Sequence, residues 1–503
     1  MNYQKTRNSS TSLTLLTDLY QLTMAYGYWK EQVEAKEAVF HMYFRRNPFQ
    51  SGFSIACGLE EVIDYLENFA FDAEDLAYLG SLIGNDGKAL FEKPFLEHLR
   101  DLRLECDIDA IPEGTPVFPS EPLVRVQGPI LQCQLLETAL LNILNFQTLI
   151  ATKAARVCLA ARGEPVLEFG ARRAQGVDGA LAASRAAYIG GCAGTSNVLA
   201  GKLYNIPVRG THAHSWVMLF DNEVEAFQAY AEAMPNNCVF LVDTYNTLDG
   251  VRHAVQVGQW LRTHGHTLAG IRLDSGDLAQ LSIEARRTLD EAGFKDASIV
   301  ASNDLDETII SSLKEQGAAI NVWGVGTRLV TGHEQPALGG VYKLGAIRDT
   351  AGEWVPKIKI SEQPIKISNP GVQQVRRYQT QGSDGKATAL ADVIYDINTD
   401  LSGGCTMIDQ YDITKQQRIA ANTPATDLLV PIFRRGQRVY ESPSIEQMRE
   451  QTRQNLAALT PGIKRFVNPH LYQVGIEQSL HETKIELIRR ARQSATGVVA
   501  GTQ

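Results

Sequence analysis

Two histidines, His212 and His214, stand where an apolar segment of the sequence, residues 205–210, gives way to a polar turn. An imidazole at the end of a strand can take up a proton, bind a metal ion or accept a phosphoryl group on nitrogen. Taken alone, a histidine in this position is about as often structural as functional. The residues that follow the neighbouring apolar runs favour the functional interpretation.

Charged and polar side chains follow those neighbouring runs as well. Residues 166–169 precede Arg172 and Arg173; 239–242 precede Asp243; 269–273 contain Arg272 and precede Asp274 and Asp277; 298–301 precede Ser302, Asn303 and Asp304; and 320–323 precede Gly324, Gly326 and Thr327. Parallel strands deliver the residues at their carboxyl ends to one face. One such coincidence would mean little, but the repetition predicts a single composite site.

Phosphate or carboxylate binding is the chemistry that these side chains suggest. Gly324, Gly326 and Thr327 offer backbone N–H groups and a hydroxyl at a strand-to-helix turn, which is a geometry that binds phosphate. Glycine turns after strands are nevertheless more often structural. Arg172 and Arg272 supply planar donors for phosphate or carboxylate, although a single arginine more commonly forms a surface ion pair.

The carboxylates allow a cation to take part. Asp243 and Asp274 could hold Mg²⁺, which prefers a few carboxylates together with substrate phosphates. Asp277 is expected to cap a helix that begins at Leu278. The sequence contains neither a G-x-x-x-x-G-K-[ST] phosphate loop nor a G-x-G-x-x-G dinucleotide fingerprint. A nucleoside triphosphate would therefore have to bind without a Walker loop.

The elements that must position these residues alternate between strands and helices. Residues 137–161 predict a long amphipathic helix. Strands are then expected at 166–169, 206–208, 239–242, 269–273, 298–301, 320–323 and 341–344, with helices at 180–188, 195–204, 224–233, 248–263, 278–292 and 305–316. This alternation predicts a parallel sheet, and so many units in succession favour an α/β barrel over the alternative of a doubly wound sheet.

The flanks differ from this pattern, so three segments are expected: an N-terminal α/β domain (1–136), a catalytic barrel (137–378) and a C-terminal segment (379–503) that is first β-rich and then helical. A helix at 18–29, a strand at 38–44, and turns with edge strands at 112–129 are predicted in the first. The last should contain a polar loop at 379–388, β-structure at 390–440, helices at 444–456 and 478–492, and a frayed end at 497–503.

Composition excludes several classes of protein. The chain has 503 residues, a formal net charge of −9 and 44% hydrophobic residues, which is ordinary for a globular protein and argues against nucleic-acid binding by bulk charge. Seven scattered cysteines without a C-x-x-C pair indicate thiols in a reducing compartment. Residues 1–12 lack the apolar core of a signal peptide, and no run is long enough to span a membrane. A cytoplasmic protein is expected.

Six blocks of sequence, in order, resemble the signature of the nicotinate phosphoribosyltransferase family. They are Leu16-Thr17-Asp18-Leu19-Tyr20-Gln21, Glu168-Phe169-Gly170-Ala171-Arg172-Arg173, Gly210-Thr211-His212-Ala213-His214-Ser215, Asp243-Thr244-Tyr245, Arg272-Leu273-Asp274-Ser275-Gly276-Asp277 and Gly339-Gly340-Val341-Tyr342-Lys343-Leu344. The resemblance is strong from about Leu15 to Leu344 and looser beyond. One departure is His212, where relatives usually carry an apolar residue; the spacing Gly-Thr-x-Ala-His selects His214.

This resemblance implies a type II phosphoribosyltransferase fold, an irregular α/β barrel packed on a mixed α/β domain that both chain ends build. It implies a homodimer with a shared site, and a reaction that joins nicotinate to 5-phosphoribosyl 1-diphosphate with coupled ATP hydrolysis. His214 would be phosphorylated by ATP and would act with Asp274. The implied nicotinate site is Tyr20 (from the other subunit), Phe169, Thr211 and Arg272, and the implied phosphoribosyl diphosphate site is Arg172, Asp243, Arg272, Gly324, Gly326 and Thr327.

Three alternatives are open at this point. His212-x-His214 could ligate zinc in a metal-dependent barrel hydrolase, but His253, His264 and His266 fall in or just after the predicted helix at 248–263, away from the other strand ends. A non-catalytic relative would be expected to lose His214 or Asp274, and this chain keeps both. A phosphoribosyltransferase that uses nicotinamide is the third alternative.

Overall fold

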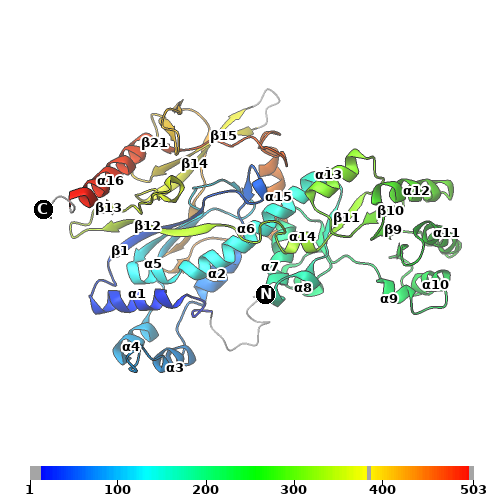
Figure 1. Cartoon of the computed structure of the whole chain (residues 1–503), viewed down its shortest axis with the longest axis horizontal. Helices are drawn as coiled ribbons and strands as arrows, with labels where there is room; N and C mark the ends of the chain where they lie inside the picture. Colours follow the sequence, from blue (N-terminus) through cyan, green and yellow to red (C-terminus); the bar gives the residue numbers. More distant parts are fainter. Residues whose placement is uncertain (1–12, 382–386, 498–503) are drawn as a thin grey trace. The chain divides into compact units, whose positions relative to one another are not determined.

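The computed structural model describes residues 13–381 and 387–497, the side chains of 494–497 excepted (Figure 1). The predicted frayed end lies almost wholly outside this range, as do residues 1–12. The chain forms two compact units: a central unit of residues 149–336, and a terminal unit of residues 1–148 and 337–503. The boundary between them falls within helix α6 (Glu137–Ala160), the long helix that the sequence predicted.

The central unit contains one parallel six-stranded sheet with the order β7-β6-β11-β10-β9-β8. Its strands are β6 (Val166–Glu168), β7 (Gly194–Thr195), β8 (Val239–Leu241), β9 (Gly270–Leu273), β10 (Ser298–Ala301) and β11 (Val322–Val325). Residues 207–209 extend the sheet beyond β7, because the Thr195 N–H donates to the Pro207 carbonyl (3.0 Å) and the Arg209 N–H donates to the Thr195 carbonyl (2.9 Å).

Helices follow the strands, and five of them begin at a side-chain cap, which is Asn197, Asn222, Asn246, Asp277 or Asp306. They are α7 (Gly176–Ile189), α8 (Val198–Tyr204), α9 (His214–Val217), α10 (Glu223–Ala233), α11 (Thr247–Thr263), α12 (Leu278–Glu291), α13 (Glu307–Glu315) and α14 (Thr327–Val330). The Asp277 carboxylate accepts the N–H groups of Ala279 and Gln280, so its predicted role as a cap is confirmed. In Figure 1, α11 and α12 lie beside β9 and β10.

The terminal unit contains a seven-stranded antiparallel sheet with the order β13-β12-β1-β5-β3-β19-β20. The strands are β1 (Glu37–Phe44), β3 (Asp107–Ala110), β5 (Val124–Pro129), β12 (Gly340–Arg348), β13 (Trp354–Pro356), β19 (Val430–Arg434) and β20 (Gln437–Arg438). Because β3 pairs with β19, segments from both halves of the sequence share one sheet. The structure is thus a mixed α/β protein.

A second, mixed sheet of the terminal unit has the order β17-β16-β21-β15-β14-β18. Its strands are β14 (Gln373–Gln381), β15 (Ala387–Asp396), β16 (Cys405–Asp409), β17 (Gln416–Ile419), β18 (Ala425–Asp427) and β21 (Val474–Glu477); β2 (Ser54–Ile55) and β4 (Pro116–Val117) form a separate pair. The helices are α1 (Leu19–Lys30), α2 (Leu59–Glu67), α3 (Ala73–Ser81), α4 (Lys93–Asp101), α5 (Ile130–Leu135), α15 (Ile445–Ala457) and α16 (Gln478–Gly497).

Several expectations were wrong in detail. The strand expected at 341–344 in the parallel sheet is part of β12, which pairs antiparallel with β1, because a short apolar run does not specify which sheet receives it. β5 lies inside the sheet and not at an edge; its Pro129 interrupts nothing because the strand ends there. The polar segment 379–388 continues β14 and β15 as an antiparallel pair, except for residues 382–386, which lie outside the described range.

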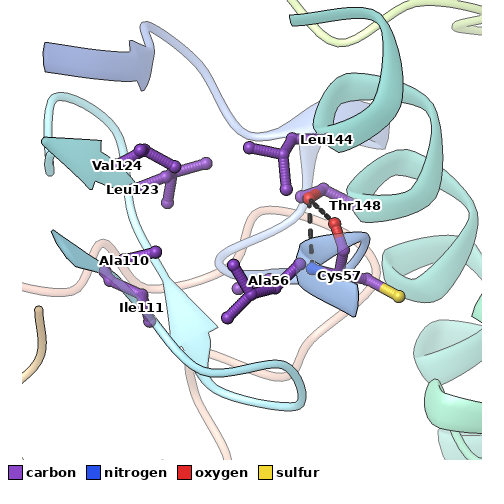
Figure 2. A pocket seen from close by; sticks show the side chains of 9 residues that line it. Ala56, Cys57, Ala110, Ile111, Leu123, Val124, Leu144 and Thr148 are labelled. Atoms are coloured by element: carbon purple, nitrogen blue, oxygen red, sulfur yellow. Dashed lines mark hydrogen bonds between the residues drawn. The ribbon is translucent and has the colours of Figure 1, made fainter. Parts of the chain in front are cut away.

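A small apolar cavity lies in the terminal unit. Figure 2 shows its lining: Ala56, Cys57, Leu59, Ala110, Ile111, Leu123, Val124, Leu144 and Thr148. The polar hydroxyl in it is already used, because Thr148 Oγ1 donates to the Cys57 carbonyl (3.2 Å) and accepts the Cys57 N–H (3.3 Å). The Thr148 hydroxyl is thus engaged within the protein, and most of the other lining side chains are apolar. Within the described residues, no helix is long and apolar enough to cross a bilayer.

One buried histidine makes the terminal unit sensitive to acid. His41 on β1 is 1% exposed, and its Nε2 accepts the backbone N–H of Gln373 (3.1 Å). Burial, together with the nearby Arg125 guanidinium, lowers the His41 pKa from 6.5 to about 3. Between about pH 3 and pH 6.5, His41 therefore binds a proton in the unfolded chain but not in the folded chain. Folding stability consequently falls as the pH decreases below 6.5.

We expect His41→Gln to flatten this dependence, because the Gln carbonyl oxygen accepts a hydrogen bond at every pH. In the wild type, His41 contributes a slope of about 1.4 kcal/mol per pH unit below pH 6.5. Urea unfolding of both proteins between about pH 4 and pH 7 measures the difference. Parallel curves for the two proteins would contradict the assignment.

Candidate active site

The guanidinium of Arg272 joins three strand ends of the central unit. Its Nε donates to Ser302 Oγ (2.9 Å) beyond β10, and its Nη1 donates to Thr211 Oγ1 (3.4 Å) in the histidine-containing turn. Its Nη2 donates to Asp274 Oδ1 (3.2 Å), just beyond β9. Arg272, Thr211 and Asp274, which the sequence placed in one site, are thus in direct contact.

Asp243 lies beside this group at the end of β8. Its Oδ2 accepts the backbone N–H of Asp274 (3.1 Å) and the hydroxyl of Ser275 (2.5 Å). Its Oδ1 is buried without a hydrogen-bond partner in the structure. A buried carboxylate oxygen without a partner is costly, so this atom fits a site where a cation binds with the substrate.

His214 faces the Asp274 carboxylate. It is the first residue of α9, and its side chain is 40% exposed. Its Nδ1 lies 3.1 Å from Thr244 Oγ1, and its Nε2 lies 3.9 Å from Asp274 Oδ2. The Thr244 hydroxyl restrains the ring while leaving it open to solvent, which suits a group that reacts with a ligand. His212 is buried by contrast, and burial lowers its pKa.

Phe169 follows β6, and its ring lies against β11. A Cβ on Gly324 would come within 2.7 Å of the ring, so the absence of a side chain at this position makes room for it. The Arg272 guanidinium lies 5.9 Å from the ring centroid, within reach of a cation–π interaction. Gly324 is therefore a residue of β11 that seats Phe169, and the turn itself begins at Gly326.

The other predicted phosphate ligands lie at neighbouring strand ends. Arg172 and Arg173 are exposed on the 3₁₀ turn Ala171–Arg173 that follows β6. Thr327 begins the four-residue helix α14. Arg328, next to it, pairs with Asp306, which fixes this turn against the start of α13.

Tyr20 belongs to the other unit. It lies in the first turn of α1, and it is 48% exposed. Burial of part of the ring and the nearby Glu137 and Asp18 carboxylates raise its pKa. It stays a predicted site residue on the strength of the resemblance.

Three hydroxyl residues contribute contacts that the sequence analysis did not assign: Thr244, Ser275 and Ser302. Each lies one to three residues beyond a strand that ends in the site. That position was the available signal, since any hydroxyl directly after β8, β9 or β10 must lie near this face. All three stand within the quoted strand-end segments, but no role was predicted for them.

The zinc hydrolase alternative finds no support in the contacts of the remaining histidines. His253 Nδ1 pairs with Glu223 Oε2 (2.7 Å), His264 stacks on Trp260, and His266 lies against Asn236. Within residues 13–381 and 387–497, no three His, Cys, Asp or Glu side chains are grouped as a metal cage. A zinc site of three protein ligands would require such a group.

Comparisons with known proteins agree with one another. Sequence models of nicotinate phosphoribosyltransferase match over residues 15–145 (N-terminal domain), 165–380 (family) and 373–484 (C-terminal domain). A nicotinate phosphoribosyltransferase of Bacillus subtilis (strain 168) is 45% identical over 485 residues, 96% of each chain. The crystal structure of human nicotinic acid phosphoribosyltransferase superposes with a TM-score of 0.81 at 32% identity, covering 94% of this chain and all of that one.

A nicotinate-nucleotide pyrophosphorylase from Pyrococcus furiosus shares the fold. Its structure superposes with a TM-score of 0.67 at 23% identity, covering 91% of this chain and 99% of that one. The fold and the strand-end site thus define an enzyme of the phosphoribosyltransferase class. The chain belongs to the nicotinate phosphoribosyltransferase family, whose members are transferases of NAD biosynthesis.

We expect Gly324→Ala to raise the KM for the aromatic substrate about tenfold, because the added Cβ displaces the Phe169 ring from its seat. Steady-state kinetics with the base varied measures the change. The matched control is Gly179→Ala in α7, where no atom lies within 4 Å of the added Cβ. An unchanged KM in a stably folded Gly324→Ala protein would show that the Phe169 ring does not contact the base.

Proposed function

We propose that this enzyme joins nicotinate to 5-phosphoribosyl 1-diphosphate, giving nicotinate mononucleotide and diphosphate, and couples the reaction to ATP hydrolysis through a phosphohistidine at His214. The observation that carries the proposal is that Asp274 contacts Arg272 and lies 3.9 Å from His214 Nε2 in a member of this family. The three supply, within one site, a cation, a carboxylate and a nucleophile.

The base is proposed to bind between Phe169 and Arg272. The Phe169 ring provides a flat surface for the pyridine ring, and the guanidinium provides donors for a carboxylate. Thr211, whose hydroxyl touches Arg272, completes this subsite on the protein's own chain. Because Arg272 is a cation, the subsite favours an acid over the neutral nicotinamide, which is the alternative base.

The phosphoribosyl diphosphate is proposed to bind along the neighbouring strand ends. Arg172, Gly326 and Thr327 are suited to its phosphates, with Gly324 shaping β11 beneath them. Asp243 and Asp274 would hold Mg²⁺, and the partnerless Asp243 Oδ1 supports this assignment. When bound, Mg²⁺ stabilises the charge that develops on the leaving diphosphate.

The ring nitrogen of nicotinate attacks C1 of the ribose, and the bond from C1 to the diphosphate oxygen breaks. Positive charge develops on the sugar, and the Asp243 and Asp274 carboxylates are suited to stabilise it. Arg272 orients the base through the carboxylate, so the attacking nitrogen is held toward the ribose.

ATP is proposed to act through His214. A ring nitrogen attacks the γ-phosphorus, ADP leaves, and water later releases inorganic phosphate from the histidine. Phosphorylation adds close to two negative charges beside Asp274 and Thr244, which can reorder the loop or prepare the magnesium site. This provides a route by which ATP hydrolysis tightens substrate binding.

We expect His214→Ala to abolish both ATP hydrolysis and the stimulation of nucleotide synthesis by ATP, because the phosphoryl acceptor is gone. Incorporation of phosphate from γ-labelled ATP, together with synthesis from nicotinate or nicotinamide with and without ATP, measures the effect. Circular dichroism confirms that the variant folds. If His214→Ala is labelled to the wild-type level, the assignment of the phosphorylated residue is wrong.

The assembly is proposed to be a homodimer in which Tyr20 of one subunit stacks on the base bound in the other. Tyr20 and its neighbour Leu19 are 48% and 53% exposed, so this end of α1 presents an apolar surface. A closed two-fold pair would let that surface reach a second chain.

Mixing Tyr20→Ala protein with His214→Ala protein, each expected to lack ATP-stimulated synthesis alone, tests this arrangement. In a shared-site dimer of one chain of each variant, both substitutions fall in one site and the other site is native. Subunit exchange should therefore restore up to about one active site per mixed dimer. Native mass spectrometry of the mixture verifies exchange. Exchange without recovery of activity would place each complete site in a single chain.

Two broader expectations complete the proposal. We propose that the parallel sheet is the irregular barrel implied by the family, because residues 207–209 add a further parallel strand next to β7. We also propose a cytoplasmic location, since the seven cysteines are reduced and thiols persist in a reducing compartment.

A further inference from the structure

The last strand of the parallel sheet, β8, has a backbone group that the sheet does not satisfy. The Val242 N–H donates to the Arg272 carbonyl of β9 (3.2 Å), so the N–H of the preceding residue, Leu241, points away from β9. Leu241 is 1% exposed, so water does not replace the missing strand. A buried N–H of this kind requires an acceptor.

His212 supplies that acceptor. Its Nε2 lies 3.3 Å from the Leu241 nitrogen. His212 follows Arg209, the residue through which the segment 207–209 pairs with β7 at the opposite edge of the sheet. One side chain therefore links the segment beyond β7 to β8, and the two edges of the sheet meet at this hydrogen bond.

The ring of His212 has little freedom to do anything else. It is 8% exposed and packs edge-on against Tyr230, with the ring centroids 4.9 Å apart, and near Phe227 and Phe240. Its Nδ1 lies 3.4 Å from the Ala213 carbonyl, so the hydrogen belongs on Nδ1 and Nε2 keeps the lone pair that the Leu241 N–H requires.

We propose that His212 is a positioning residue that closes the parallel sheet and thereby holds the turn carrying His214 against the end of β8. Two residues beyond His212, His214 meets Thr244, which lies three residues beyond Leu241 (Nδ1 to Oγ1, 3.1 Å). The buried hydrogen bond between His212 and Leu241 therefore lies beside the exposed contact between His214 and Thr244. Because the same two segments make both, the buried hydrogen bond fixes the distance at which His214 meets Thr244. The proposal rests on the proposed function only in the role of His214.

Hydrogen exchange tests the closure without reference to activity. We expect the Leu241 amide of the wild-type protein to exchange slowly although β8 is an edge strand in backbone pairing. His212→Phe keeps the aromatic packing and removes the acceptor, so the peptide covering β8 should gain about one rapidly exchanging amide. Exchange at the wild-type rate in this variant, or an unprotected Leu241 amide in the wild type, would overturn the closure.

A matched pair of variants separates the hydrogen bond from packing. The carbonyl oxygen of His212→Gln reaches the position of Nε2, whereas that of His212→Asn reaches only the position of Nδ1. We expect the Leu241 amide to exchange slowly in His212→Gln, as in the wild type, and fast in His212→Asn. Equal behaviour of the two would show that ring packing, and not the Nε2 acceptor, holds the turn.

Labelling with γ-labelled ATP tests positioning. His212→Asn should lower the rate of ATP-dependent labelling about tenfold, on the scale of one lost hydrogen bond, and His212→Gln should recover most of it. Normal labelling of His212→Asn with a fast-exchanging Leu241 would overturn the positioning role. If wild-type protein takes no label, the phosphohistidine proposal fails, and the exchange measurements still decide the closure.

Discussion

The guanidinium of Arg272 is the group that the strand ends must accommodate. Its side chain is 16% exposed, and a cation so far from water is costly unless its donors are used. Ser302, Thr211 and Asp274 use them, and these residues come from three different segments. The turns after β9 and β10 and the histidine turn are therefore held at one place by a single planar group.

The two carboxylates near Arg272, Asp274 and Asp243, differ in their partners. Asp274 shares the positive charge, whereas Asp243 is held by one backbone N–H and one hydroxyl and keeps a buried oxygen without a partner. Two neighbouring carboxylates, of which only Asp274 pairs with Arg272, leave negative charge at this end of the sheet. This charge supports the proposal that Mg²⁺ binds here together with a substrate rich in phosphate.

Local sequence patterns predicted most elements of the central unit, because each helix or strand is specified by residues close together in the sequence. The helix at 137–161, the strands near 166, 239, 270 and 298, and the cap at Asp277 are confirmed, since each depends on residues within a few positions of itself. The strand predicted at 341–344 exists but lies in the antiparallel sheet, and β5, in the segment 112–129, lies inside that sheet and not at an edge. The sequence did not show this because β12 and β5 find their partners far away along the chain. The strand expected at 320–323 lies at 322–325.

The order of arginine, aspartate and histidine after successive strands can be predicted from local sequence, because residue type and strand position depend on nearby residues. The family signature likewise indicates the enzyme class without a structure. The difference between the two histidines depends on the fold: His212 is buried against β8, and His214 faces Asp274 from the surface. The two stand two residues apart in one turn, and what separates them is the approach of β8, a contact between segments about thirty residues apart that no local pattern encodes.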